Sequence, residues 1–196
     1  MTFAEQLEEV YLITNRRDLE AETKSAIKAA TLKAHHSDFY SKDIFETGVE
    51  FSSSSYRQSL DYVTLYSNFR AFKYVRVVTG EDDDLGTTIE IITPEEVLDS
   101  YGCNRNDIAY VAGRVLEIRS STSFTKILIG AYVLPIVREV DYLSWVAEQH
   151  PFAIVYEAAR VVFKAIGYSE QSTAFSRLAA EEFGLLRMSA LSDVGY

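Results

Sequence analysis

The sequence predicts an α+β fold, a mostly helical bundle with a small antiparallel β-hairpin sheet inserted between N-terminal and C-terminal helices. Apolar residues recur at helical spacing near both ends of the chain, which indicates helices there. The middle of the chain instead carries short β-branched and aromatic runs separated by turn residues. Helices and strands do not alternate along the sequence, which argues against a parallel, doubly wound sheet.

Two helices are expected at the N-terminus, over about residues 2–14 and 16–35. Thr2 and Glu5 have the spacing of a capping box, a pattern that begins a helix. Alanines on the second helix favour close packing against a neighbouring helix. Residues 37–62 show no clear period, and the run of four serines within them is interpreted as an exposed loop.

The middle of the chain predicts two hairpins around a short helix. Thr93 and Pro94 have the positions of an N-cap and a first helical residue, so a helix is expected over about 94–101. The acidic run 81–84 is interpreted as the turn of the first hairpin, and the polar run 120–123 as the turn of the second. The expected strands cover about residues 71–78, 87–92, 110–119 and 125–134.

The C-terminal third predicts a helical hairpin whose first arm is apolar on most sides and must therefore be covered on most sides. Pro151 is placed to begin this arm and Gly167 to end it. Phe163 is expected in the core between this arm, the last helix and the first helix. The expected helices cover about 142–148, 151–166 and 170–188, followed by a tail over 189–196, and the whole chain is expected to form a single domain over 1–196.

Composition limits the classes of function. The chain has 196 residues, 47% of them hydrophobic, and a net charge of −10, which argues against nucleic-acid binding by counterion release. The single cysteine, Cys103, cannot form an intramolecular disulfide, and a buried or loop thiol is favoured over a nucleophile. The sequence shows no signal peptide, and its longest apolar run, 127–137, is about half a membrane span. A soluble protein made in the cytoplasm is expected.

The sequence contains no motif that assigns a catalytic, cofactor-binding or metal-binding role to any residue. The chain has no phosphate-binding glycine loop and no Gly-x-Ser-x-Gly elbow. His35 and His36 diverge by about 100° on a helix, so they are interpreted as residues that interact with the helix dipole rather than as a metal pair. The acidic run 81–84 lacks the ligand spacing of a calcium loop. The sequence therefore predicts no enzyme, no cofactor and no metal site.

The chain has 13 Tyr and 11 Phe residues. Tyrosine is favoured at protein interfaces because it combines a large contact area with a polar tip. Many of these rings belong in the core. Together with the apolar helix and the lack of a catalytic set, they indicate a component of an assembly.

Several motifs in residues 109–188 occur in the order seen in one family. They are Tyr110-Val-Ala-Gly-Arg, the pair Leu134-Pro135, the segment Asp141-Tyr-Leu-Ser-Trp, a Pro-started helix rich in alanine, a glycine break and a last helix. In these features the chain resembles the head-to-tail adaptor (connector) proteins of short-tailed bacteriophages. Residues 2–34 also match the two opening helices of such proteins, whereas residues 37–65 diverge.

The resemblance implies a structural protein of the virion neck, a ring of about twelve copies between the portal protein and the tail nozzle or tail-fibre proteins. DNA would pass through its channel during ejection without specific binding. A ring of this size would carry a charge of about −120, which would keep DNA from adhering. In the family the C-terminal end reaches the portal, so Leu191, Val194 and Tyr196 are the candidate portal contacts. A frayed terminus without a role is the alternative.

Other functions stay open at the level of sequence. One is a soluble intracellular enzyme or ligand-binding protein with no recognisable site, and another is a head-completion protein of a long-tailed phage. For an adaptor, the net charge of −10 per subunit opposes spontaneous association. The free protein is therefore expected to be mostly monomeric and to form a ring on the portal.

Overall fold

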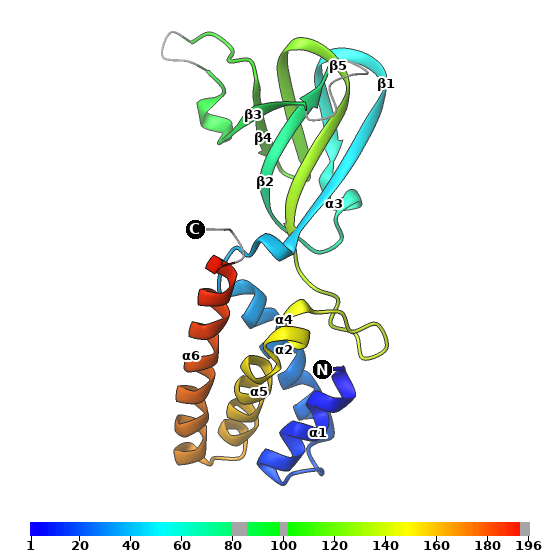
Figure 1. Ribbon diagram of the computed structural model, residues 1–196. Coiled ribbons are helices and arrows are strands. Elements are labelled where there is room, and N and C mark those ends of the chain that lie inside the picture. The colour runs from blue at the N-terminus through cyan, green and yellow to red at the C-terminus, as the bar shows by residue number, and fades with distance from the viewer. Residues whose placement is uncertain (80–85, 99–101, 193–196) are drawn as a thin grey trace. The chain divides into compact units, whose positions relative to one another are not determined.

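The computed structural model describes residues 1–79, 86–98 and 102–192 and divides into two compact units (Figure 1). A helical unit combines residues 1–43 with the segment from residue 134 onward. A β unit consists of Ile44–Val133. The β unit is thus inserted between the N-terminal and C-terminal helices, as expected. The single domain expected over 1–196 contains two separate hydrophobic cores, one in each unit.

The helical unit begins with the predicted capping box. The Thr2 side chain accepts a hydrogen bond from the Glu5 N–H at 3.3 Å, and the Glu5 carboxylate accepts one from the Thr2 N–H at 2.7 Å. Pro151 begins the apolar arm of the C-terminal hairpin, as the sequence indicated. The α-helices of this unit are α1 (Phe3–Thr14), α2 (Glu20–His36), α4 (Trp145–Gln149), α5 (Pro151–Ala165) and α6 (Ser169–Ser192).

Helix α5 is the centre of the helical unit, with α1, α2 and α6 packed around it. Its alanines allow these neighbours to approach closely. Phe163 is 5% exposed and stacks on Phe175 of α6, with 5.4 Å between ring centroids. It belongs to a core cluster shared by the first, second and last two long helices, where the sequence placed it.

The β unit is a closed four-strand barrel with one additional strand. Strands β5, β2, β3 and β4 pair in that order, and β4 pairs back to β5, which closes the ring. The β3–β4 pair is parallel and the other pairs are antiparallel. The strands are β1 (Ile44–Asp61), β2 (Phe69–Val78), β3 (Thr87–Ile92), β4 (Ile108–Ala112) and β5 (Val115–Val133).

The expected mostly helical bundle with a small hairpin sheet is therefore wrong, although the α+β class holds. The first reason is β1, which occupies most of the segment expected to be a loop and pairs antiparallel with β5. Its register shifts between Glu50 and Ser55 and again between Ser55 and Arg57. Each shift breaks the alternation of inward and outward side chains, which is why no period is visible in the sequence.

The second reason is that residues 120–123 are no turn. They lie inside β5, which runs through most of the second hairpin expected from the sequence, whereas residues 110–112 belong to β4. Asp107 accepts hydrogen bonds from the Ser121 N–H at 2.8 Å and from its hydroxyl at 2.9 Å, so these polar residues are satisfied within a strand. The actual turn joins β4 to β5 at Gly113 and Arg114, where Gly113 has a φ of 66°.

Shorter elements also differ from expectation. The helix expected over 94–101 is a 3₁₀ turn at Pro94–Val97 with the predicted capping box, and residues 99–101 lie outside the described residues, as does the acidic turn 81–84. A short helix α3 (Tyr62–Leu65) precedes β2. Within the described ranges, none of the helices is both long and apolar enough to cross a membrane.

Candidate functional site

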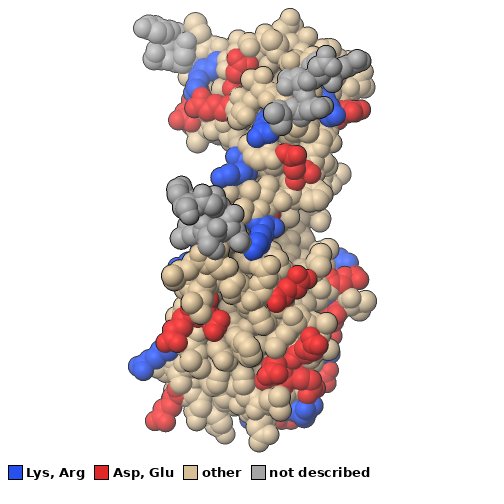
Figure 2. Space-filling model, viewed as in Figure 1, with Lys and Arg blue, Asp and Glu red and all other residues tan. Residues whose placement is uncertain are grey.

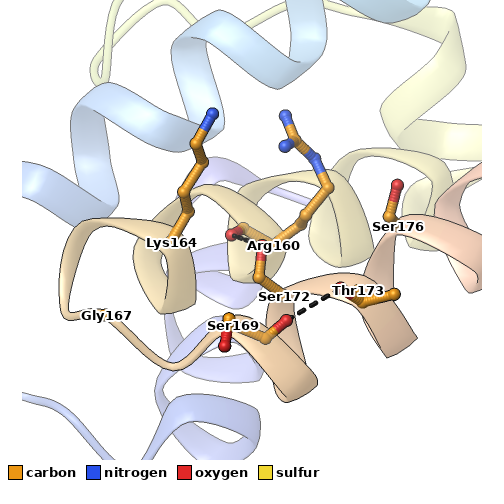
Figure 3. Close-up of a pocket in the computed structure, with 7 residues that line it drawn as sticks. All are labelled: Arg160, Lys164, Gly167, Ser169, Ser172, Thr173 and Ser176. Atoms are coloured by element: carbon orange, nitrogen blue, oxygen red, sulfur yellow. Dashed lines mark hydrogen bonds between the residues drawn. The ribbon is translucent and has the colours of Figure 1, made fainter.

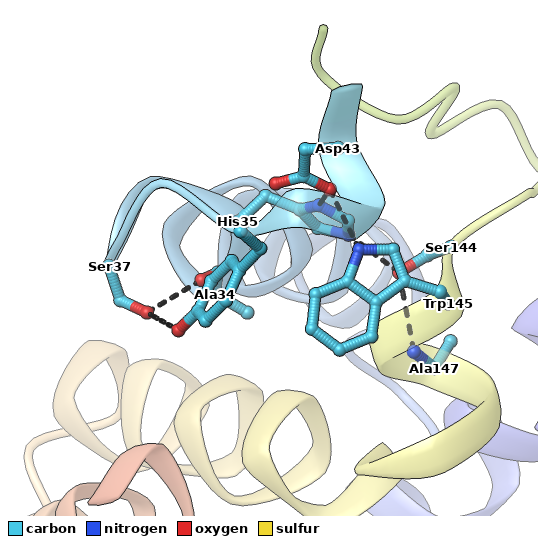
Figure 4. Close-up of polar contacts among 8 residues, drawn as sticks. Ala34, His35, Ser37, Asp43, Ser144, Trp145 and Ala147 are labelled. Carbon is cyan, nitrogen blue, oxygen red and sulfur yellow. Dashed lines mark hydrogen bonds and ion pairs between the residues drawn. The ribbon is translucent and has the colours of Figure 1, made fainter. Parts of the chain in front are cut away.

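A buried chain of polar side chains connects three segments of the helical unit (Figure 4). His35 lies near the end of α2, Asp43 ends the 3₁₀ turn Ser41–Asp43, and Ser144 precedes α4. The His35 Nδ1 lies 2.7 Å from the Asp43 Oδ1, and the His35 Nε2 lies 2.9 Å from the Ser144 Oγ. Trp145 donates its indole N–H to the same Asp43 oxygen at 2.7 Å.

This order of hydroxyl, imidazole and carboxylate is that of a nucleophilic triad. The surroundings of these three side chains instead indicate that they hold segments of the helical unit together. The Ser144 residue is 4% exposed, and its hydroxyl accepts the Ala147 N–H at 3.2 Å as the N-cap of α4. His35 and Asp43 are also buried, and the Trp145 ring packs edge-on against His35. In this arrangement a substrate carbonyl has no access to the hydroxyl.

The two adjacent histidines separate as their helical spacing predicts. His35 is buried in the polar chain, whereas His36 is exposed. Among the described residues, no three His, Cys, Asp or Glu side chains come close enough together to hold a metal ion. Sequence reasoning placed His35 at the helix dipole and missed its bonds to Asp43 and Ser144, because these partners lie 8 and 109 residues away in the chain.

One sequence motif indicates the position of this buried polar chain. The Asp141-Tyr-Leu-Ser-Trp segment supplies Ser144 and Trp145, and also Tyr142, whose hydroxyl bridges the first two helices. Tyr142 donates to the Gln6 Oε1 at 3.0 Å and lies 2.7 Å from the Thr31 Oγ1. The polar residues of this motif therefore hold the segment before α5 against α1 and α2.

A pocket of about 370 Å³ lies where α5 meets α6 (Figure 3). Its polar groups largely bond to one another. Ser172 donates to the Arg160 carbonyl at 3.2 Å, and Thr173 donates to the Ser169 carbonyl at 2.8 Å. The Arg160 guanidinium is engaged by Glu157 through two hydrogen bonds, of 2.9 and 2.7 Å. These internal bonds account for much of the lining, and no ligand is assigned to this pocket.

Two apolar surfaces of the helical unit are exposed. The first is residues 136–143, which we call the apolar loop; Ile136, Val140 and Leu143 in it are 44%, 93% and 67% exposed. The second, which we call the outer face of α6, is formed by Ala174, Leu178, Glu181, Leu185 and Met188. Leu178, Leu185 and Met188 are 38%, 54% and 69% exposed. Large exposed apolar patches typically mark sites of protein contact. In the loop, the exposed charged residues Arg138, Glu139 and Asp141 lie between the apolar ones.

Charges on the visible face of the molecule are of both signs and interleaved (Figure 2). This face therefore carries no continuous basic surface of the kind that tracks a nucleic-acid backbone. Cys103, the lone cysteine, is exposed. Of the candidate portal contacts, Leu191 lies in the last turn of α6, where only the backbone is described, and Val194 and Tyr196 lie outside the described residues.

Comparison of the chain with models of known protein families and with curated proteins finds no match. Two structural features therefore bear on function. The buried polar chain connects segments of the helical unit. The two exposed apolar surfaces are available to other proteins.

Proposed function

We propose that this protein is the head-to-tail adaptor of a short-tailed bacteriophage. In this role about twelve copies form a ring in the virion neck that joins the portal protein to the tail nozzle or tail-fibre proteins. DNA passes through the ring without specific binding. The motifs of residues 109–188 support the family, and the exposed apolar surfaces of the helical unit support the assembly.

The observation that carries the proposal is that the helical unit exposes two separate sets of apolar side chains, one on the apolar loop and one on the outer face of α6. The loop is attached to α1 and α2 by Tyr142, and α6 packs on α5. A subunit in which one surface binds a different surface of the next copy associates head to tail, and such association closes into a ring when the rotation permits.

The buried polar groups agree with a structural role. His35, Ser144 and Tyr142 each have hydrogen-bond partners inside the helical unit. Their bonds fix the segment that leads from the β unit into α5. The net charge of −10 per subunit favours a channel that repels DNA phosphates.

The test is attachment to portal rings of the same virus. Purified protein mixed with purified portal rings should co-sediment with them, and electron microscopy should show an added ring. Protein that leaves portals undecorated at micromolar concentration would overturn the proposal.

Truncation then locates the portal contact. Removing residues 193–196, and separately all residues after Met188, should weaken attachment and leave the melting temperature nearly unchanged. A matched control is Glu170→Gln on an exposed turn at the other end of α6, which should attach normally. Normal decoration by the longer truncation would move the portal contact from the tail to the folded body.

A further inference from the structure

We propose that the outer surface of the β unit carries a binding site for a phosphate group, built around Arg57 of β1 and Arg119 of β5. This site goes beyond the adaptor function and does not depend on it. Three observations carry the inference. The two arginines are direct cross-strand neighbours, the groups around them present more hydrogen-bond donors than acceptors, and the nearby carboxylates are bound to other groups.

Two like charges face each other across the β1–β5 pair. Arg57 and Arg119 lie directly opposite each other in its antiparallel register. Directly opposite residues project from the same face of a sheet, with Cβ atoms about 4.5–5.5 Å apart, and like charges in such a pair destabilise it. Neither guanidinium forms an ion pair with a residue that the structure describes. An anion bound between them would replace this repulsion with two attractive contacts.

The Arg119 guanidinium is held in position by neutral groups. Its Nη1 donates to the Asn104 Oδ1 at 3.1 Å, and its Nη2 donates to the Tyr110 hydroxyl at 3.2 Å. Its central carbon lies over the Tyr110 ring, 5.5 Å from the ring centroid, at the distance of a cation–π contact. A guanidinium has five N–H groups, and these two bonds leave three of them for a ligand.

The groups around Arg119 add further donors. Tyr110 and Asn104 use their oxygens to accept from Arg119, so the tyrosine hydroxyl hydrogen and the amide hydrogens of Asn104 are left as donors. Arg57 is exposed, and its guanidinium has no acceptor among the residues of the described ranges. A cluster of this kind, with two positive charges and spare N–H and O–H groups, fits an oxyanion.

Two carboxylates lie near the site, and both are bound to other groups. Glu117 lies two residues before Arg119 on β5, on the same face, and the Ser59 hydroxyl lies 2.8 Å from both of its carboxylate oxygens. Asp107 accepts hydrogen bonds from the N–H and the hydroxyl of Ser121. Neither carboxylate forms an ion pair with the two arginines. Their charges weaken the attraction of the site for an anion without occupying its donors.

Two guanidinium groups favour a phosphate over a carboxylate. One arginine already binds both oxygens of a carboxylate, whereas a phosphate group has enough oxygens for two arginines. Inorganic phosphate and phosphate monoesters carry a charge of about −1.5 to −2 at pH 7, which matches two guanidinium groups. The phosphates of a DNA strand carry one charge each. The site therefore suits a free or terminal phosphate rather than a nucleic-acid backbone.

Titration of ¹⁵N-labelled protein with sodium phosphate, followed by NMR, tests the site. The Nε–H signals of Arg57 and Arg119 should shift and saturate. The signal of Arg114, which lies 3.6 Å from Asp61, should not. Sodium chloride at the same ionic strength is the reference, because salt alone screens the repulsion. Shifts that do not saturate, that chloride reproduces, or that affect all arginines equally would overturn the proposal.

Substitutions then test the role of each charge. Arg57→Gln and Arg119→Gln should each weaken phosphate binding by about tenfold or more, the effect of losing one charge-assisted hydrogen bond. Arg114→Gln should bind phosphate normally. Glu117→Gln should strengthen binding by about threefold, because it removes a negative charge close to the ligand. A Glu117→Gln protein that melts at a lower temperature and binds phosphate no better would show that Glu117 is the partner of the arginines, against the proposal.

The melting temperature gives an independent readout. Phosphate should raise the melting temperature of the unaltered protein, because it binds the folded state alone. Arg57→Gln should abolish this rise without lowering the melting temperature in phosphate-free buffer, since it also removes the like-charge repulsion. A lower melting temperature for Arg57→Gln in phosphate-free buffer would give this arginine a structural role instead.

Three further ligands test the assignment to a terminal phosphate. Phenyl phosphate, a monoester, should bind as well as inorganic phosphate. Acetate and dimethyl phosphate, which carry one charge each, should bind more weakly at the same ionic strength. Equal binding of acetate would overturn the choice of phosphate over carboxylate, and equal binding of dimethyl phosphate would indicate a nucleic-acid backbone as the ligand and overturn the proposal.

Discussion

The ammonium of Lys33 lies 2.7 Å from the Oε1 of Glu157, a carboxylate whose side chain is only 4% exposed. Arg160, one turn later on α5, binds both oxygens of the same carboxylate. Burial raises the pKa of Glu157, but the hydrogen bonds from Arg160 and Lys33 outweigh it, and the pKa is lowered overall. The ion pair between Lys33 and Glu157 joins α2 to the middle of α5.

Stability should therefore depend on Glu157 in a pH-dependent way. The pKa of Glu157 is lower in the folded state than in the unfolded chain, so its contribution is full above the unfolded value of about 4.3 and disappears as pH falls through the folded value. Glu157→Gln should cost about 1–3 kcal/mol at pH 7 and much less at pH 3. Urea unfolding at both pH values measures this. Glu181→Gln, on an exposed carboxylate, is the control, and an equal loss in both variants would contradict the prediction.

The core position of Phe163 gives a second prediction. Phe163→Ala removes the ring that stacks on Phe175, and should lower the free energy of unfolding by about 3–5 kcal/mol. Leu12→Ala, at a 70% exposed position, should change it by less than about 0.5 kcal/mol. A loss below about 1 kcal/mol for Phe163→Ala would show that the helix is oriented differently.

Gly130 and Tyr74 should be energetically coupled in the β unit. They are paired across β5 and β2, and a Cβ added at Gly130 would lie 2.5 Å from atoms of the Tyr74 ring. Gly130→Ala should displace that ring, break its hydrogen bond to Glu46 and cost about 1–3 kcal/mol. In a Tyr74→Ala background the same substitution should cost little. A double-mutant cycle of unfolding free energies measures the coupling, and additive costs would contradict it.

Ser144 should act as a helix cap and not as a nucleophile. Ser144→Ala should cost about 1 kcal/mol of stability, the usual value for an N-cap. A fluorophosphonate probe should not label the protein, and the protein should not cleave purified peptidoglycan or simple esters. A label that Ser144→Ala removes, or turnover lost with a single carboxylate substitution, would show that the polar chain is catalytic.

The elements predicted correctly are those whose ends carry local signals. Helix α5 lies between Pro151 and Gly167, and α1 begins at the Thr2 capping box. Strand β1 escaped prediction because its two register shifts remove the alternation that identifies a strand. Glu157 carries no local signal of burial, and its partner Lys33 lies on another helix, 124 residues away in the chain. The bond between His35 and Ser144 was invisible for the same reason, since no local pattern reports a partner 109 residues away.

The insertion of the β unit sets an order for folding during synthesis. Residues 1–43 emerge from the ribosome before Ile44–Val133, and α5 follows only afterwards. At about 5–20 residues per second, α1 and α2 wait roughly 5–20 s for the helix that covers them. The barrel is contiguous in sequence and can close during this interval. The apolar face of α2 is built largely from alanines, with Ile27 its one large buried apolar side chain, so the waiting helix exposes little that would recruit other nascent chains.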